Sequence, residues 1–239
     1  WLDRTRNPYG DGLVRVVQPD ETGLDHSPKW DALLGITEFT VQGATEGWHR
    51  VCDPYDAFQR DPAQMIALDH FVVADVMVNT IYIENLRLLA GMLRDTGDIS
   101  RAEVYDTRAS QAYNSLMELC WDEADGLFYD VANKANTKIR VNTFTSLMPL
   151  FLADLPKDKA DRLISHLLNP EEYWAEYPVP TVSMTEPTFE PGTVGEILVW
   201  RGPTWMNSNW YLARGLMRHG YPAEASYIAE QSVKLAQTS

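Results

Sequence analysis

The sequence has little cysteine, a deficit of positive charge and no long hydrophobic run, and each shortage excludes a class of protein. Its two cysteines, Cys52 and Cys120, are too few and too far apart for a disulfide framework or a zinc site, so we expect buried free thiols. A net charge of −14 argues against nucleic acid as a partner. The longest apolar region, residues 71–93, is interrupted by four polar residues, so we expect no membrane span.

The chain is long enough for one hydrophobic core, and we expect a single domain over residues 1–239. No signal peptide is visible, which favours a cytoplasmic protein. The chain opens on Trp1 rather than Met and closes on "VKLAQTS". We therefore expect both ends to be internal to a longer protein, with portions missing on each side.

Apolar residues recur at three- and four-residue steps from Met65 to Leu93 and predict one long helix. Gly97 is suited to end it, and Ser100 with Glu103 resembles a capping box that begins a second helix, forming an antiparallel hairpin. Further helices are predicted at 143–153, at 157–168, after Pro203 and after Pro222. The pattern indicates an all-α protein, layered or toroidal, with long loops and a few short strands.

The segment "WDEADGLFYD", residues 121–130, combines acidic residues with a turn signal at Asp125-Gly126. A short strand is predicted over 127–129. The acidic spacing suggests calcium, but the segment lacks the ligand pattern of an EF-hand loop. We therefore favour a structural turn and expect neither a metal site nor a cofactor.

The segment "QPDETGLDHSPKWD", residues 18–31, is a second place where carboxylates gather. Its prolines and glycine favour a rigid loop over a helix. Asp20, Glu21 and Asp25 could serve glycosidic hydrolysis, in which one carboxyl protonates the leaving oxygen and another activates water or attacks the sugar. Taken alone, each of them is more typical of an ordinary cap or turn residue.

A loop at residues 196–210 is rich in side chains that bind sugars. Indole rings cover the apolar faces of a pyranose, while amide and guanidinium groups bind its hydroxyls. The same tryptophans could also simply belong to the core. The residues concerned are Trp200, Arg201, Trp205, Asn207, Asn209 and Trp210.

Four segments together resemble a known enzyme family. "QPDETGLDHSPKWD" looks like the "HPWESGxDNSPRWD" motif of glycoside hydrolase family sixty-three and its mannosylglycerate and glucosylglycerate hydrolase relatives. "WRGPTWMNSNWYLARGLMRHGY" is similar to its "YWRGPxWxNxNWLLxxGLxRyGY", "CWDEADGLFYD" to "LWDEEDGxFYD", and "HFVVADVMVN" to "PFxVxDPLFN". The resemblance extends from about Asp11 to Tyr221.

The resemblance implies an (α/α)6 toroid with a pocket at one end and an inverting mechanism on α-glycosides. It places Asp25 as the general acid. A general acid must be protonated near neutral pH, so we expect dry, aromatic surroundings that raise the pKa of Asp25. It also implies a small carbohydrate substrate, such as an α-glucoside, an α-mannoside or a glycosylglycerate. The positions matched to substrate-binding residues are Glu21, Asp20, Trp200, Arg201 and Trp205, and more loosely Arg60 and Asp75.

The sequence departs from the family pattern in two ways. Asp20 replaces the tryptophan of the first motif, which leaves the particular sugar open. The family's general base is a glutamate that follows the helices after "WRGP", and we expect it beyond Ser239; a "QWxWDS"-type segment is also absent. Glu186, Glu190 and Glu196 are substitutes that no motif supports, and an inverting partner of Asp25 should lie roughly 6.5–9.5 Å from it.

Two other functions remain open. A sugar epimerase or isomerase on a similar toroid would depend on histidines, but of the five only His26 lies in a motif loop. A non-catalytic carbohydrate-binding module would follow if the protein lacked the downstream glutamate. The sequence does not predict an oligomeric state.

Overall fold

The computed structural model describes residues 1–192 and 200–238, and this part of the chain is mostly helical, as predicted. Within the described residues four helices lie in the N-terminal region and five follow. They are α1 (Leu2–Thr5), α2 (Asp31–Leu34), α3 (Val41–Cys52), α4 (Pro62–Leu68), α5 (Val76–Asp95), α6 (Ile99–Ser115), α7 (Lys157–Leu167), α8 (Met206–Arg218) and α9 (Pro222–Thr238). None of these helices is both long and apolar enough to span a membrane.

Short strands and tight turns connect the helices. The strands are β1 (Val73–Ala74), β2 (Trp121–Asp122), β3 (Leu127–Phe128), β4 (Val131–Ala132) and β5 (Thr137–Lys138). They form an antiparallel sheet of order β1-β4-β5 and an antiparallel β2-β3 pair. The 3₁₀ turns are η1 (Pro19–Thr22), η2 (Pro28–Trp30), η3 (Asp53–Phe58) and η5 (Phe144–Phe151), and η4 (Leu116–Cys120) is a π turn.

The structure divides the helix predicted from Met65 to Leu93 into two. Asp69, at a φ of 52°, ends α4 in the left-handed conformation. Strand β1 then pairs with β4, and the side chain of Asp75 caps the start of α5 by accepting from Val78 N. The periodic pattern could not detect this break because the residues of β1 are apolar and buried, as helix residues would be.

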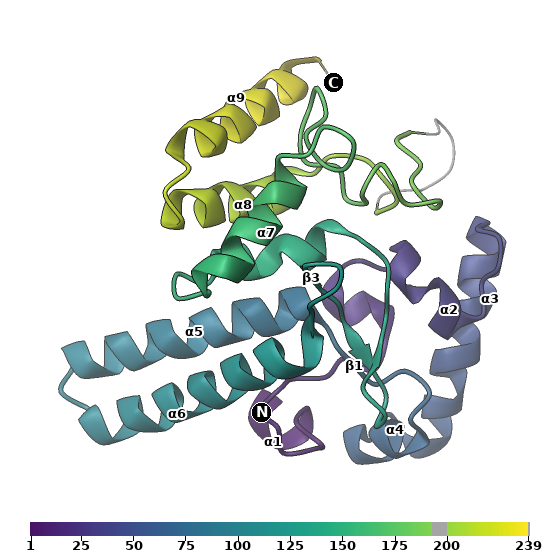
Figure 1. Ribbon diagram of the computed structural model, residues 1–239. Coiled ribbons are helices and arrows are strands. Elements are labelled where there is room, and N and C mark those ends of the chain that lie inside the picture. Colours follow the sequence, from purple (N-terminus) through teal and green to yellow (C-terminus); the bar gives the residue numbers. More distant parts are fainter. Residues whose placement is uncertain (193–199, 239) are drawn as a thin grey trace.

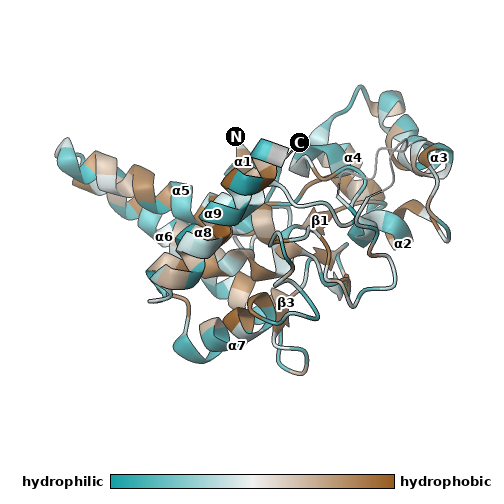
Figure 2. Cartoon of the chain, turned by 90° about the horizontal axis from the view of Figure 1, so that it is seen from above, coloured by the Kyte–Doolittle hydropathy of each residue, from teal (hydrophilic) through white to brown (hydrophobic). Residues whose placement is uncertain are grey.

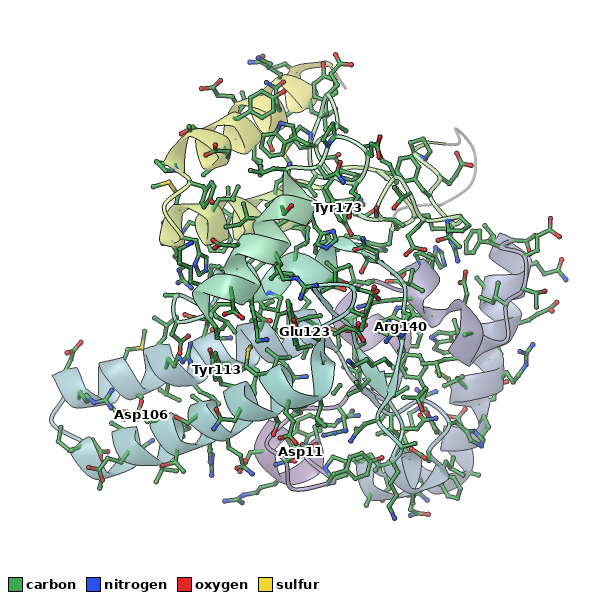
Figure 3. The ribbon with its side chains drawn as sticks, viewed as in Figure 1. Asp11, Asp106, Tyr113, Glu123, Arg140 and Tyr173 are labelled. Carbon is green, nitrogen blue, oxygen red and sulfur yellow. The ribbon has the colours of Figure 1, made fainter. Side chains whose placement is uncertain are left out.

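The predicted antiparallel hairpin is confirmed, with α5 packed along α6 and Gly97 at a φ of 82° in the turn. Its cap is not the predicted Ser100, because Asp98 accepts from Arg101 N and the helix already begins at Ile99. Near the outer end of the hairpin Asp106 pairs with Arg94 (Figure 3). The closing turn brings the chain back to the core.

The predicted helix at 143–153 is instead the 3₁₀ turn η5. Pro149 lies inside it and has no backbone N–H to donate, which prevents a regular α-helical ladder. The turn is almost entirely buried, and both α7 and α8 pack on it. The α8 contact is close, because a Cβ at Gly215 would lie 2.9 Å from the Cβ of Leu150.

The α5–α6 hairpin and the α2–α4 region lie on opposite sides of the short strands (Figures 1 and 2). Helices α8 and α9 pack against each other above the hairpin in Figure 1. The two cysteines are buried free thiols, as expected, and burial raises the pKa of Cys52 to about 12. The acid loop of residues 18–31 follows the N-terminal bridge between Val16 and Val73 and leads into α2.

Candidate active site

The acid loop, residues 18–31, is built from the turns η1 and η2, with Gly23 between them at a φ of 71°. Glu21 holds the first turn in place. Its carboxylate accepts from Val17 N at 2.8 Å and pairs with the buried Arg6. Burial raises the pKa of Glu21, although the bonds from Val17 and Arg6 act in the opposite direction. Because both oxygens are engaged within the protein, Glu21 shapes the loop.

Asp25 lies on the outer side of the acid loop and is exposed. It contributes to a cavity of about 180 Å³ that also includes side chains of α2 and α3. The lining residues are Asp20, Asp25, His26, Leu34, Ala44, Thr45 and Trp48. The dry surroundings predicted for Asp25 are not found among the described residues, since Asp25 is exposed.

A buried ionic cluster anchors the other end of the acid loop. Lys29 Nζ lies 2.5 Å from an Asp75 oxygen and 2.9 Å from an Asp130 oxygen, and all three side chains are at most 3% exposed. The remaining Asp130 oxygen accepts from Val76 N. Burial raises the pKa of Asp130, and the charge of Lys29 offsets only part of this effect. Lys29 therefore ties the acid loop to the start of α5.

Asp75, one of the predicted substrate-binding residues, belongs to this cluster and is fully buried. Its second oxygen caps α5 at Val78 N, so both oxygens are occupied by the protein. It does not line the cavity beside Asp25. Within the described contacts Asp75 therefore holds the acid loop in place through Lys29.

Trp200 and Trp205 stack on each other, with ring centroids 4.7 Å apart and an interplanar angle of 20°. Trp200 is 8% exposed and also stacks on Phe144, whereas Trp205 is 37% exposed at the start of α8. The inner indole is thus a core residue and the outer one reaches the surface. Trp200 therefore belongs to the core, whereas the sugar-binding role expected of Trp205 stays a prediction.

Arg201 connects this tryptophan pair to the acid loop. It is 3% exposed, its guanidinium pairs with Asp31, and its Cζ lies 3.7 Å from the ring centroid of Phe39. The Phe39 ring makes an edge contact with His26, the neighbour of Asp25. The two loops that the sequence singled out are therefore joined through Phe39 and Asp31.

Other candidates lie elsewhere. Arg60 is exposed and pairs with Asp56, and it does not line the cavity. Asn209 is buried and accepts from Val179 N, whereas Trp210 borders an apolar groove of about 430 Å³ formed by α8 and α9.

Among the substitute bases, Glu186 accepts from Asn142 N, Glu190 donates its backbone N–H to the Arg201 carbonyl, and Glu196 lies outside the described residues.

The structure adds one residue that the sequence analysis missed. Trp48, on α3, lines the cavity and donates its Nε1–H to Asp20 at 2.9 Å. The two residues are 28 positions apart, and only the tertiary fold brings them together. Thr40, whose side chain accepts from Gly43 N, is the local cap signal that could have located α3.

The segment 121–130 forms a structural turn. Asp122 accepts from Asp125 N and pairs with Lys138 and Arg140, and Arg140 lies between the two sides of the molecule (Figure 3). Burial would raise the pKa of Asp122, but these bonds outweigh burial and lower it to about 2. Over residues 1–192 and 200–238 no three His, Cys, Asp or Glu side chains form a cluster that could hold a metal ion.

Over its full length, residues 1–239, the sequence matches the mannosylglycerate hydrolase MGH1-like glycoside hydrolase domain. The chain belongs to this glycoside hydrolase family. It is 29% identical to the mannosylglycerate hydrolase of Thermus thermophilus, over 99% of this chain and 60% of that protein. It is 22% identical to the glucosylglycerate hydrolase of Mycolicibacterium hassiacum, over 99% of this chain and 57% of that protein.

Solved structures agree with this assignment. The crystal structure of a GH63 mannosylglycerate hydrolase from Thermus thermophilus in complex with glucose superposes with a TM-score of 0.85 and 26% identity, over 100% of this chain and 60% of that one. Neutral trehalase Nth1 from Saccharomyces cerevisiae shares the fold, at a TM-score of 0.62 and 16% identity, over 97% of this chain and 47% of that one. The chain thus spans about 60% of the mannosylglycerate hydrolase that it resembles.

Proposed function

We propose that this chain carries the general-acid half of an inverting α-glycosidase, with Asp25 as the acid. The observation that supports the proposal is the position of Asp25 on a cavity wall, in a loop held rigidly by Lys29 and Glu21. A general acid must keep its carboxyl within hydrogen-bond reach of the leaving oxygen, and a buried anchor limits its movement. The complete protein would then close the (α/α)6 toroid implied by the family.

The sugar that is cleaved would lie on the side of Trp205. An indole that is 37% exposed and backed by Trp200 offers a flat apolar face of the kind that pyranose rings cover. Arg201 would position this platform, because it is buried behind it and paired with Asp31. The substrate would be an α-mannoside or an α-glucoside.

The general base stays a prediction. Glu186 accepts from Asn142 N, and among the described residues it does not line the cavity beside Asp25. We place the base on a glutamate of the family that follows α9 in the complete protein. Its carboxyl should lie roughly 6.5–9.5 Å from that of Asp25, which leaves room for the attacking water.

An epimerase would need a histidine pair, and the described contacts favour this less. His49 pairs with Asp53, His166 pairs with Glu172, and His219 contacts backbone carbonyls of η5 and its C-terminal neighbour. Of the histidines in the described part of the chain, His26 alone lines the cavity with Asp25. A single histidine beside carboxylates suits hydrolysis better than reversible proton transfer on both faces of a sugar.

The decisive test is Asp25→Asn in the complete protein, assayed on α-mannosides and α-glucosides. We expect kcat to fall by about 10²–10⁴-fold, the usual contribution of a general acid, while the substrate still binds. Asp53→Asn, an exposed carboxylate at the end of α3, is the matched control and should leave kcat unchanged. NMR of the released sugar should show the inverted anomer first. Normal turnover by Asp25→Asn would remove Asp25 from the acid role.

A further inference from the structure

The cavity beside Asp25 has a composition of its own. The indole of Trp48 is partly buried in its wall and is oriented by the 2.9 Å hydrogen bond from Nε1 to the Asp20 carboxylate. Leu34 and Ala44 supply the apolar part of the wall. An aromatic ring fixed by a carboxylate, next to small apolar groups, suits one face of a small polyhydroxy compound.

Two wall residues are among the five positions at which the acid loop differs from the family motif. Asp20 stands where the motif has tryptophan, and His26 where it has asparagine. Both line the same cavity. Because Trp48 reaches Asp20 from another helix, the cavity regains an indole, but at a different position and with a carboxylate beside it. Two of the differences from the motif therefore fall at this one cavity.

The position of this subsite follows from the acid. A general acid protonates the glycosidic oxygen between the sugar that is cleaved and the leaving group. The sugar and the leaving group therefore lie on opposite sides of that oxygen. In our proposal the sugar lies toward Trp205. The cavity on the α3 side of Asp25 then receives the leaving group. Its volume of about 180 Å³ is small, which suits a compact leaving group better than a long glucan chain.

The charge of the cavity selects among compact leaving groups. Its seven lining residues include the carboxyls of Asp20 and Asp25 and, within the described part of the chain, no Lys or Arg. Arg6 pairs with Glu21, the residue after Asp20, and Arg50 donates to the carbonyl of Leu34. Among the described residues, a carboxylate on the leaving group would meet the charge of Asp20 without a Lys or Arg in the cavity wall to pair with.

We propose that Trp48 and Asp20 form the leaving-group subsite of this enzyme, and that the subsite selects an uncharged polyol or sugar over an anionic leaving group such as glycerate. This inference rests on the proposed function, since it places the subsite relative to Asp25. Trp48 stacks against the leaving group. Asp20 orients the indole, accepts hydroxyl hydrogen bonds and repels carboxylates.

The test compares two substrates with the same α-linked sugar, one ending in glycerol and one in glycerate, on the complete protein. We expect kcat/KM to favour the glycerol glycoside by about tenfold or more, a conservative size for one like-charge contact near a protein surface. Asp20→Asn keeps an acceptor for the Trp48 indole but removes the charge. It should lower this preference about tenfold, mainly through the KM of the glycerate glycoside.

Trp48→Ala should raise KM for both substrates, and Trp48→Phe should restore most of the loss, since a ring is retained. Asp53→Asn removes a charge near α3 but outside the cavity and should leave the preference unchanged. A preference for the glycerate glycoside, or a preference that Asp20→Asn does not alter, would overturn the inference.

A binding measurement separates this inference from the proposed function. Calorimetric titration of the Asp25→Asn variant with both glycosides requires no turnover. If neither glycoside is hydrolysed by the unmodified protein, the proposed hydrolysis fails. If the glycerol glycoside nevertheless binds more tightly and the difference depends on Asp20, the subsite stands; equal binding of the two would refute it.

Discussion

Replacing Lys29 by methionine is the most direct test of how the acid loop is held. The Nζ atom of Lys29 is the cation that the cluster provides for two buried carboxylates, Asp75 at 2.5 Å and Asp130 at 2.9 Å. Methionine has a similar length and fills the same space without charge. The substitution would leave two buried carboxylates facing each other, so at least one of them must take up a proton or draw in water.

The expected loss is large for a single substitution. Removing one partner of a buried pair costs about 3–5 kcal/mol, because the remaining charge stays desolvated. In a chain of 239 residues each kcal/mol lowers the melting temperature by about 2–4 °C. The Lys29→Met protein should therefore melt about 6–20 °C lower than the unmodified protein.

The assay is thermal unfolding of the complete protein followed by far-UV circular dichroism, together with a urea titration at the same pH. Lys157→Met is the matched control, since Lys157 is 86% exposed and pairs with Asp161 on the surface. Such pairs contribute about 0–1 kcal/mol. A triple variant with Lys29→Met, Asp75→Asn and Asp130→Asn should recover part of the loss. If Lys29→Met destabilises no more than Lys157→Met, the cluster does not anchor the loop.

Two further predictions concern packing and pH. Gly215→Ala should destabilise the protein by about 1–3 kcal/mol, because the added Cβ would lie 2.9 Å from Leu150. Gly91→Ala has open space around the added Cβ and should stabilise α5 by about 0.5–1 kcal/mol. Chemical denaturation measures the free energy of unfolding of both variants. The pKa of Asp122 in the folded protein, about 2, lies below its ordinary 3.8, so its stabilisation is complete above about pH 4 and is lost as the pH falls toward 2. Between about pH 5 and pH 2.5 the urea midpoint of the unmodified protein should therefore fall further than that of Asp122→Asn, and parallel profiles would contradict this assignment.

The helices were predictable wherever the chain repeats its apolar residues without interruption. The α5–α6 hairpin, α7 and the two C-terminal helices follow from periodicity and from Gly or Pro at their ends. Strand β1 was not predictable, because a strand of two residues is too short to show an alternating pattern and its partner β4 lies far along the chain. The 3₁₀ geometry of η5 depends on Pro149, whose missing N–H outweighs an apolar pattern typical of a helix.

The candidate site divides in the same way. The motifs located Asp25, Trp200 and Arg201, and the structure joins their loops through Phe39. Motifs could not assign the role of Asp75, because a carboxylate that binds a sugar and one that binds a buried lysine look identical in a sequence. Trp48 was missed for a related reason: its role depends on a tertiary hydrogen bond and not on its neighbours along α3.

The contacts of the acid loop separate rigidity from selectivity. The residues that hold its shape, Glu21 and Lys29, are bound to backbone amides or to buried carboxylates, so changing them disturbs the loop itself. Asp20 and Trp48 are linked to each other at the cavity wall by a hydrogen bond that involves neither of those two residues. Asp20 does act on its neighbour Glu21, because its charge contributes to raising the pKa of Glu21, whereas no hydrogen bond links Trp48 to Lys29 among the described contacts. In our proposal the leaving-group subsite at position 20 can therefore differ from the motif while the proposed acid at position 25 is still held by the same anchors.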